Sequence, residues 1–112
     1  MNERSLQFLE TLVNTPSPSG HESRGLRVWL DYVGQYADET YSDAYGNCVA
    51  VLIKGGGPRL MLASHADEIG MTVNYIDDNG YVYVRKLGGT NPAITKAQRL
   101  TIHTRKGPVK GV

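Results

Sequence analysis

Residues 60–70 read LMLASHADEIG, and this stretch decides how the rest of the chain is interpreted. The apolar run that opens it is typical of a strand buried on both faces of a sheet. The run leads into His65, and Asp67 follows two residues later. Because alternate residues of an extended chain point to the same side, both side chains should face one cleft at the carboxyl end of the strand. Imidazole is a common metal ligand that a nearby carboxylate can orient, so the first hypothesis is a metal-dependent hydrolase.

Composition restricts the class of protein. A length of 112 residues with 40% hydrophobic residues predicts a small globular chain rather than a disordered one. The net charge is +1 and no basic tract stands out, so neither nucleic acid nor a membrane surface is an expected partner. Cys48 is the only cysteine, which excludes an internal disulfide and fits a reducing compartment. No signal peptide or membrane-spanning run is recognisable, so we expect a cytoplasmic protein.

The first part of the chain alternates helical patterns with strands. Apolar residues recur at helical spacing over residues 3–14, and Pro16 should end that helix. Ser19 and Glu22 have the spacing of a capping box, in which the Ser19 hydroxyl accepts from the third helical amide. A second helix should then run to about residue 35. Its buried stripe would consist of Leu26, Trp29, Leu30 and Val33. Two strands, at residues 40–42 and 48–53, and a glycine loop at residues 55–58 should precede the His65 strand.

The pattern changes after Gly70. From there the chain consists of short, half-polar strands joined by turns, which is typical of a small β-barrel or sandwich. The expected strands cover residues 71–76, 81–86, 100–104 and 109–112. The first two flank the turn sequence DDNG and should form a hairpin. This change of character predicts a boundary near Gly70, with residues 1–70 and 71–112 as two parts of an α/β protein.

Several short motifs, taken in order, resemble one known family. They are PSGHE at 18–22, YGN at 45–47, HADEIG at 65–70, DNG at 78–80, GG at 88–89, QRL at 98–100 and GPVKGV at 107–112. The series spans nearly the whole chain. It resembles the N-terminal part of the dinuclear-metal aminopeptidases that assemble into tetrahedral particles, which include glutamyl and deblocking aminopeptidases and endoglucanase-like proteins. The most specific of the motifs is His-x-Asp-Glu-Ile-Gly.

The resemblance implies a fold and an activity. Residues 1–70 would be the N-terminal part of a metallopeptidase α/β catalytic domain. Residues 71–112 would begin a small β-barrel-like insertion domain that is used in oligomer contacts. The implied protein is a cytoplasmic, homo-oligomeric metallo-aminopeptidase that releases N-terminal residues from peptides with two divalent ions, zinc or cobalt. The ions would polarise the scissile carbonyl and activate water, and a downstream glutamate would move the proton.

The same resemblance assigns the site residues. It makes His65 a ligand of one metal ion and Asp67 the catalytic carboxylate that supports it, while Glu68 is expected to be structural. The family's other site residues are a bridging aspartate, a Glu-Glu pair, a further acidic ligand and a late histidine. They lie downstream of this motif and have no position in these 112 residues. A catalytic metal needs at least three protein ligands, so we expect this chain alone to be inactive. It would be a fragment, a truncated gene product or one part of a divided enzyme.

Two other interpretations of the chain remain open. It could be a non-catalytic assembly or binding module that works through the strands after Gly70, or a non-functional remnant. For His65 the simpler alternative is a core histidine that is hydrogen-bonded at the end of a strand. His21 and His103 make no ligand spacing with His65, and both are expected to be structural.

Overall fold

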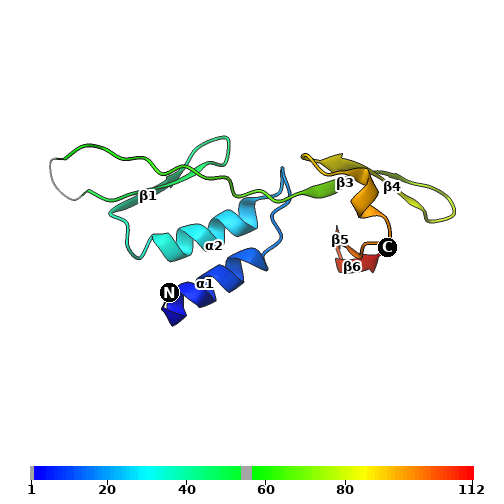
Figure 1. The fold of residues 1–112 in the computed structure, drawn as a ribbon, viewed down its shortest axis with the longest axis horizontal. Helices are drawn as coiled ribbons and strands as arrows, with labels where there is room; N and C mark the ends of the chain where they lie inside the picture. Colours follow the sequence, from blue (N-terminus) through cyan, green and yellow to red (C-terminus); the bar gives the residue numbers. More distant parts are fainter. Residues whose placement is uncertain (1, 54–56) are drawn as a thin grey trace. The chain divides into compact units, whose positions relative to one another are not determined.

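The computed structural model describes residues 2–53 and 57–112 and shows a mixed α/β chain (Figure 1). The chain divides into two compact units, Met1–Gly70 and Met71–Val112. The first unit contains α1 (Glu3–Val13), α2 (Ser23–Val33), β1 (Glu39–Ser42) and β2 (Cys48–Val51). The second contains β3 (Gly70–Ile76), which starts on the last residue of the first unit, and β4 (Val82–Leu87), η1 (Pro92–Thr95), β5 (Leu100–Thr104) and β6 (Gly107–Gly111).

Helix α1 confirms the predicted first helix. The Asn2 side chain caps it by accepting a hydrogen bond from the Ser5 N–H at 2.8 Å. Such a cap satisfies one of the amides that have no partner within the helix. The helix ends at Val13, with Asn14 as its C-cap residue, shortly before Pro16, whose missing N–H cannot continue a helix.

The capping box predicted for α2 is wrong. The helix begins at Ser23, and its N-cap residue Glu22 makes no side-chain cap. Glu22 Oε1 accepts from the Gly20 N–H at 2.6 Å, and the Ser19 hydroxyl donates to the Asp67 carboxylate. A charged carboxylate is a stronger hydrogen-bond partner than a helical amide, which explains why the local pattern was overridden.

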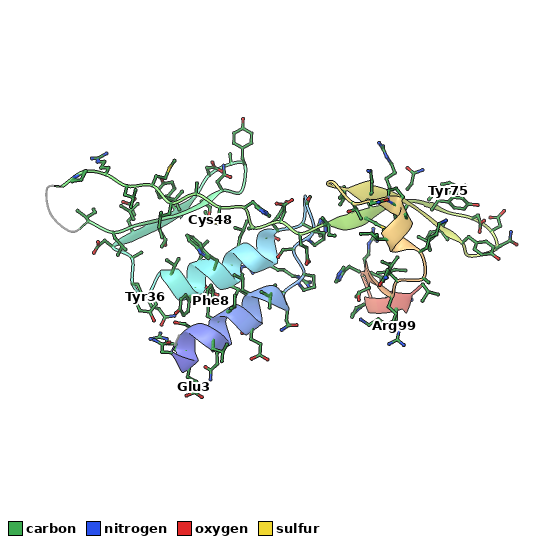
Figure 2. The ribbon with its side chains drawn as sticks, in the orientation of Figure 1. Glu3, Phe8, Tyr36, Cys48, Tyr75 and Arg99 are labelled. Carbon is green, nitrogen blue, oxygen red and sulfur yellow. The ribbon has the colours of Figure 1, made fainter. Side chains whose placement is uncertain are left out.

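The two helices pack through aromatic side chains. The rings of Phe8 and Tyr32 stack at a centroid distance of 3.9 Å, and the hydroxyls of Ser5 and Tyr32 lie 3.1 Å apart. Tyr36 continues the group at 5.5 Å from Tyr32 (Figure 2). The predicted stripe on α2 is only half-buried, and no apolar side chain among the described residues is fully buried.

Helix α2 lies between α1 and the hairpin of β1 and β2 (Figure 1). The two strands are antiparallel, with Glu39 opposite Val51 and Ser42 opposite Cys48. The predicted turn between them is confirmed, with Gly46 at a φ of +87°. The second predicted strand is shorter than expected and ends at Val51. Half of the predicted glycine loop, Gly55 and Gly56, lies outside the described residues.

The predicted buried strand before His65 is not formed. Residues 58–67 have no regular secondary structure, and Leu60, Met61 and Leu62 are 86%, 85% and 90% exposed. A strand is stable only when neighbours satisfy its amides and carbonyls. In the part of the chain that the structure describes, no strand pairs with residues 60–64.

The second unit consists of two antiparallel hairpins. Strands β3 and β4 pair around the predicted DDNG turn, and Tyr75 stacks on Tyr83 at 4.2 Å (Figure 2). Strands β5 and β6 pair from Leu100 opposite Gly111 to Thr104 opposite Gly107. The 3-10 helix η1, capped by Asn91, was not predicted. Within residues 57–112 the sheets stay two-stranded and do not close into a barrel.

The helices of the described residues are too short and too polar for a candidate membrane span.

Candidate functional site

The structure brings His65 and Asp67 together. The Nδ1 atom of His65 lies 2.9 Å from Asp67 Oδ1 and 3.0 Å from the Asp67 carbonyl oxygen. Both of these neighbours are acceptors, so Nδ1 carries the proton and donates it. The Nε2 atom is then the ring nitrogen that can accept or ligate. The His65 side chain is 84% exposed, so an external partner can reach it.

A third side chain completes the arrangement from far away in the sequence. The Ser19 hydroxyl donates to Asp67 Oδ2 at 2.5 Å, across 48 residues. Each oxygen of the carboxylate therefore has its own donor, Ser19 on one side and His65 on the other. These two hydrogen bonds, the one from Ser19 first, hold the pKa of Asp67 below its ordinary value. The carboxylate is thus kept charged and oriented.

Backbone contacts between residues 17–19 and 67–68 hold these side chains in register; we call this set of contacts the clasp. Pro18 and Glu68 form a parallel β-bridge. The Glu68 N–H donates to the Ser17 carbonyl at 2.9 Å, and the Ser19 N–H donates to the Glu68 carbonyl at 3.3 Å. The Glu68 carboxylate accepts from the Ser17 N–H at 2.8 Å. Glu68 therefore has a structural contact, and its carboxylate binds a backbone amide.

Helix α2 supports the clasp at Gly25. Ser17 is only 6% exposed, and its hydroxyl donates to the Thr15 carbonyl at 3.1 Å. A Cβ atom placed on Gly25 would lie 2.2 Å from Ser17 Oγ, so only glycine allows this approach. Sequence reasoning missed both residues. The available signal was a glycine inside a helix, which costs about 0.5–1 kcal/mol relative to alanine and so calls for a packing reason.

The other histidines stay apart from this group. His21 Nδ1 lies 3.0 Å from the Gly20 carbonyl oxygen, and His103 sits in β5 opposite Pro108. Among residues 2–53 and 57–112, no cluster of three or more His, Cys, Asp or Glu side chains could hold a metal ion. What the described residues offer is one imidazole nitrogen with its carboxylate support, which fits one ligand of a metal centre and not a complete one.

Comparison with known proteins gives this geometry a context. The sequence profile of the M42 glutamyl aminopeptidase family matches residues 46–112. The chain is 37% identical over 107 residues to a lysyl aminopeptidase of Pyrococcus furiosus. The aligned region covers 95% of this chain and 31% of that protein.

Solved structures give the same result for the fold. The TET aminopeptidase of the marine sediment archaeon Thaumarchaeota archaeon SCGC AB-539-E09 superposes with a TM-score of 0.93 and 32% identity, over 99% of this chain and 31% of that one. PhTET1-12s, a dodecamer, superposes with a TM-score of 0.82 and 27% identity, over 98% of this chain and 32% of that one.

The chain thus spans about a third of the length of each of these relatives. The family match extends over more than half of its residues and includes both His65 and Asp67. The similarity in sequence and in fold runs from the first helix to the last strand. The chain belongs to the M42 glutamyl aminopeptidase family of metallo-aminopeptidases.

Proposed function

We propose that this chain is the N-terminal segment of a metal-dependent aminopeptidase, and that His65 provides one metal ligand through Nε2. The observation that carries the proposal is the orientation of the His65 ring relative to Asp67. Its Nδ1–H donates to Asp67, which leaves Nε2 as the ligating atom on an exposed side chain. In metal sites a carboxylate commonly orients a ligating histidine in this way. We assign that orienting role to Asp67, and propose that it is the catalytic carboxylate that supports His65.

When bound, two divalent ions, zinc or cobalt, would polarise the scissile carbonyl and lower the pKa of a water molecule. Among the described residues, no cluster of His, Cys, Asp or Glu side chains supplies a complete set of ligands. The remaining ligands and the general base therefore have to be proposed elsewhere. We propose that these come from the two thirds of the relatives' length that this chain does not span. The part played by this chain is to hold one imidazole in a single tautomer and orientation, so that its ligand atom needs no rearrangement when metal binds.

The proposed substrates are peptides with a free N-terminus, as the aminopeptidase relatives suggest. We also propose that the complete protein is a homo-oligomer, on the model of the dodecameric PhTET1-12s. In the proposed homo-oligomer of this protein, the unit that contains β3 to β6 would begin a β-barrel-like insertion domain, and that domain would make oligomer contacts. A cytoplasmic location remains a prediction from cysteine usage.

The test uses the complete open reading frame that encodes this chain. The purified product is loaded with zinc or cobalt and assayed on aminoacyl p-nitroanilides, and its bound metal is measured by mass spectrometry. His65→Ala should lose about one metal ion per subunit and most of the activity, because one ligand of the centre is removed. His103→Ala is the matched control and should keep both. Unchanged metal content and hydrolysis in His65→Ala would contradict the proposed function.

A second candidate is a non-catalytic assembly module, and one observation favours it. The sheets of the second unit are two-stranded, so their outer edges leave unpaired amides and carbonyls that can add a further strand. This function predicts self-association of the 112-residue chain. A single monomeric species in light scattering at working concentration would exclude it.

A further inference from the structure

The contact between Ser19 and Asp67 has no role in the family assignment, yet it links the first loop of the chain to the carboxylate that holds His65. Ser19 lies between α1 and α2, whereas Asp67 lies 48 residues later. Their hydrogen bond of 2.5 Å is the shortest side-chain contact in the site. A hydroxyl donor to a charged carboxylate is among the stronger hydrogen bonds in proteins.

The geometry gives this bond a directional effect. A carboxylate held only by His65 could rotate about its terminal torsion, which is broad in aspartate. With Ser19 on Oδ2 and His65 on Oδ1, both oxygens are occupied and the plane of the carboxylate is set. The imidazole then meets a fixed carboxylate oxygen beside the Asp67 carbonyl oxygen, rather than a carboxylate that rotates.

The clasp explains why Ser19 can act reliably from a loop. The bridge between Pro18 and Glu68 sets the register of the two segments, and two backbone hydrogen bonds maintain it. The Ser17 N–H is held in addition by the Glu68 carboxylate. Ser19 and Asp67 each lie next to a bridge residue, so the backbone, and not only the side-chain contact, places them together.

We propose that Ser19 is a positioning residue, which orients the Asp67 carboxylate and through it the metal-binding face of His65. The proposal rests on the proposed function, since it needs His65 to be a ligand. The hydroxyl is the part of Ser19 that matters. Threonine should therefore support the site and alanine should not.

The experiment measures zinc affinity of the complete gene product by competition with a chromophoric chelator. Ser19→Ala should weaken binding at the His65 site by about 10-fold, the lower end of what losing an outer partner of a metal ligand costs. Ser19→Thr should recover most of that loss. Ser23→Ala removes an exposed hydroxyl from the start of α2 and should bind zinc like the unchanged protein. Equal affinity in Ser19→Ala and Ser23→Ala would overturn the proposal.

Two further measurements separate positioning from simple loss of structure. In the metal-free protein, nitrogen NMR of His65 should show the Nδ1–H tautomer, and Ser19→Ala should reduce its population while the thermal unfolding midpoint stays close to that of Ser23→Ala. In the loaded protein, kcat should fall more than KM rises. An unchanged tautomer population, or a threonine variant as weak as the alanine variant, would count against the role of the hydroxyl.

His65→Ala in the same zinc titration distinguishes the two proposals. If His65→Ala loses the site and Ser19→Ala does not, only the positioning role fails. If His65→Ala binds zinc unchanged, the proposed function fails first, and the positioning role fails with it.

Discussion

Gly25 shows how a residue without a side chain supports the site. It lies in the first turn of α2, against Ser17 of the clasp. Alanine in a helix interior is normally more stable than glycine by about 0.5–1 kcal/mol. Here the added methyl group would meet Ser17 Oγ at 2.2 Å, so either the hydroxyl would have to turn away from the Thr15 carbonyl or the loop would have to move.

We therefore expect Gly25→Ala to destabilise the complete protein by about 1–3 kcal/mol, the usual cost of overpacking. The measurement is urea unfolding together with zinc affinity, because a displaced clasp should also weaken the His65 site. The double variant Gly25→Ala with Ser17→Gly removes the clash and should recover stability. Gly89→Ala, whose added methyl group meets nothing within 4 Å, is the control. A stabilised Gly25→Ala variant would contradict the packing argument.

Two residues of the candidate site, His65 and Asp67, were predicted from the sequence. The spacing of His65 and Asp67 was enough to place both side chains on one side of the chain, and they are in contact. Their roles in metal binding and catalysis remain predictions. The contact of Ser19 was not predicted, because the capping rule considers only neighbours within one helical turn. Its actual partner is 48 residues away.

At the level of elements, local patterns predicted those structures whose partners are also local. Helix α1 and the turn between β3 and β4 lie where the sequence indicated, since caps and turns depend on residues a few positions apart. The strand predicted before His65 failed for the opposite reason. Its apolar pattern needs neighbouring strands on both sides, and the described residues do not provide them.

The stacked pair of Phe8 and Tyr32 should hold α1 against α2. Both rings are half-buried, so we expect Phe8→Ala in the complete protein to cost about 1–2 kcal/mol, less than a fully buried phenylalanine. A double-mutant cycle with Tyr32→Ala should give a coupling energy of about 0.5–1.5 kcal/mol for the stack. Additive single effects would show that the rings do not interact.

The turn between β1 and β2 should depend on pH through Asp43. Its carboxylate accepts from the side chain of Asn47 at 2.7 Å and from the backbone amides of Tyr45 and Asn47 at 2.9 Å. These hydrogen bonds, the one from the Asn47 side chain first, hold the pKa of Asp43 below its ordinary value of 3.8. A lowered pKa in the folded state means that the charged form stabilises the hairpin above pH 3.8, and that this is lost as the pH falls through the folded value.

Asn47→Ala should therefore raise the pKa of Asp43 toward 3.8, because its main donor is removed. Carbon NMR of the Asp43 carboxyl during an acid titration measures this change. Asn74→Ala, in the β3 strand of the second unit, is the control and should leave the Asp43 titration where it is. A pKa that does not move in Asn47→Ala would exclude the amide as its cause.

At the scale of the whole molecule, the described residues lack a fully buried apolar side chain. Burial of apolar surface is the dominant favourable contribution to folding, so the 112-residue chain alone should be only marginally stable. The side chains of Leu60, Met61 and Leu62 are the most exposed apolar group in the first unit outside the turns. We infer that the rest of a complete protein covers them.

The isolated chain should bind a hydrophobic dye such as ANS and unfold without a sharp transition. The complete gene product should not bind the dye and should unfold in a sharp transition. Replacing Leu60 and Leu62 with lysine gives the decisive comparison. In the isolated chain the change should reduce dye binding and improve solubility, but in the complete protein it should prevent folding, because two charges would be buried. A complete protein that tolerates both lysines would show that this segment stays exposed.

The clasp also has a kinetic consequence. It joins positions 48 and 51 residues apart through a few hydrogen bonds, and each of these contributes only about 1 kcal/mol net. The two segments should therefore open and reclose as a unit far more often than the helices unfold, and amide hydrogen exchange at Ser19 and Glu68 should report those openings. If metal binds at His65, it would favour the closed clasp. Exchange at these amides would then be slower in the metal-loaded protein than in the metal-free protein.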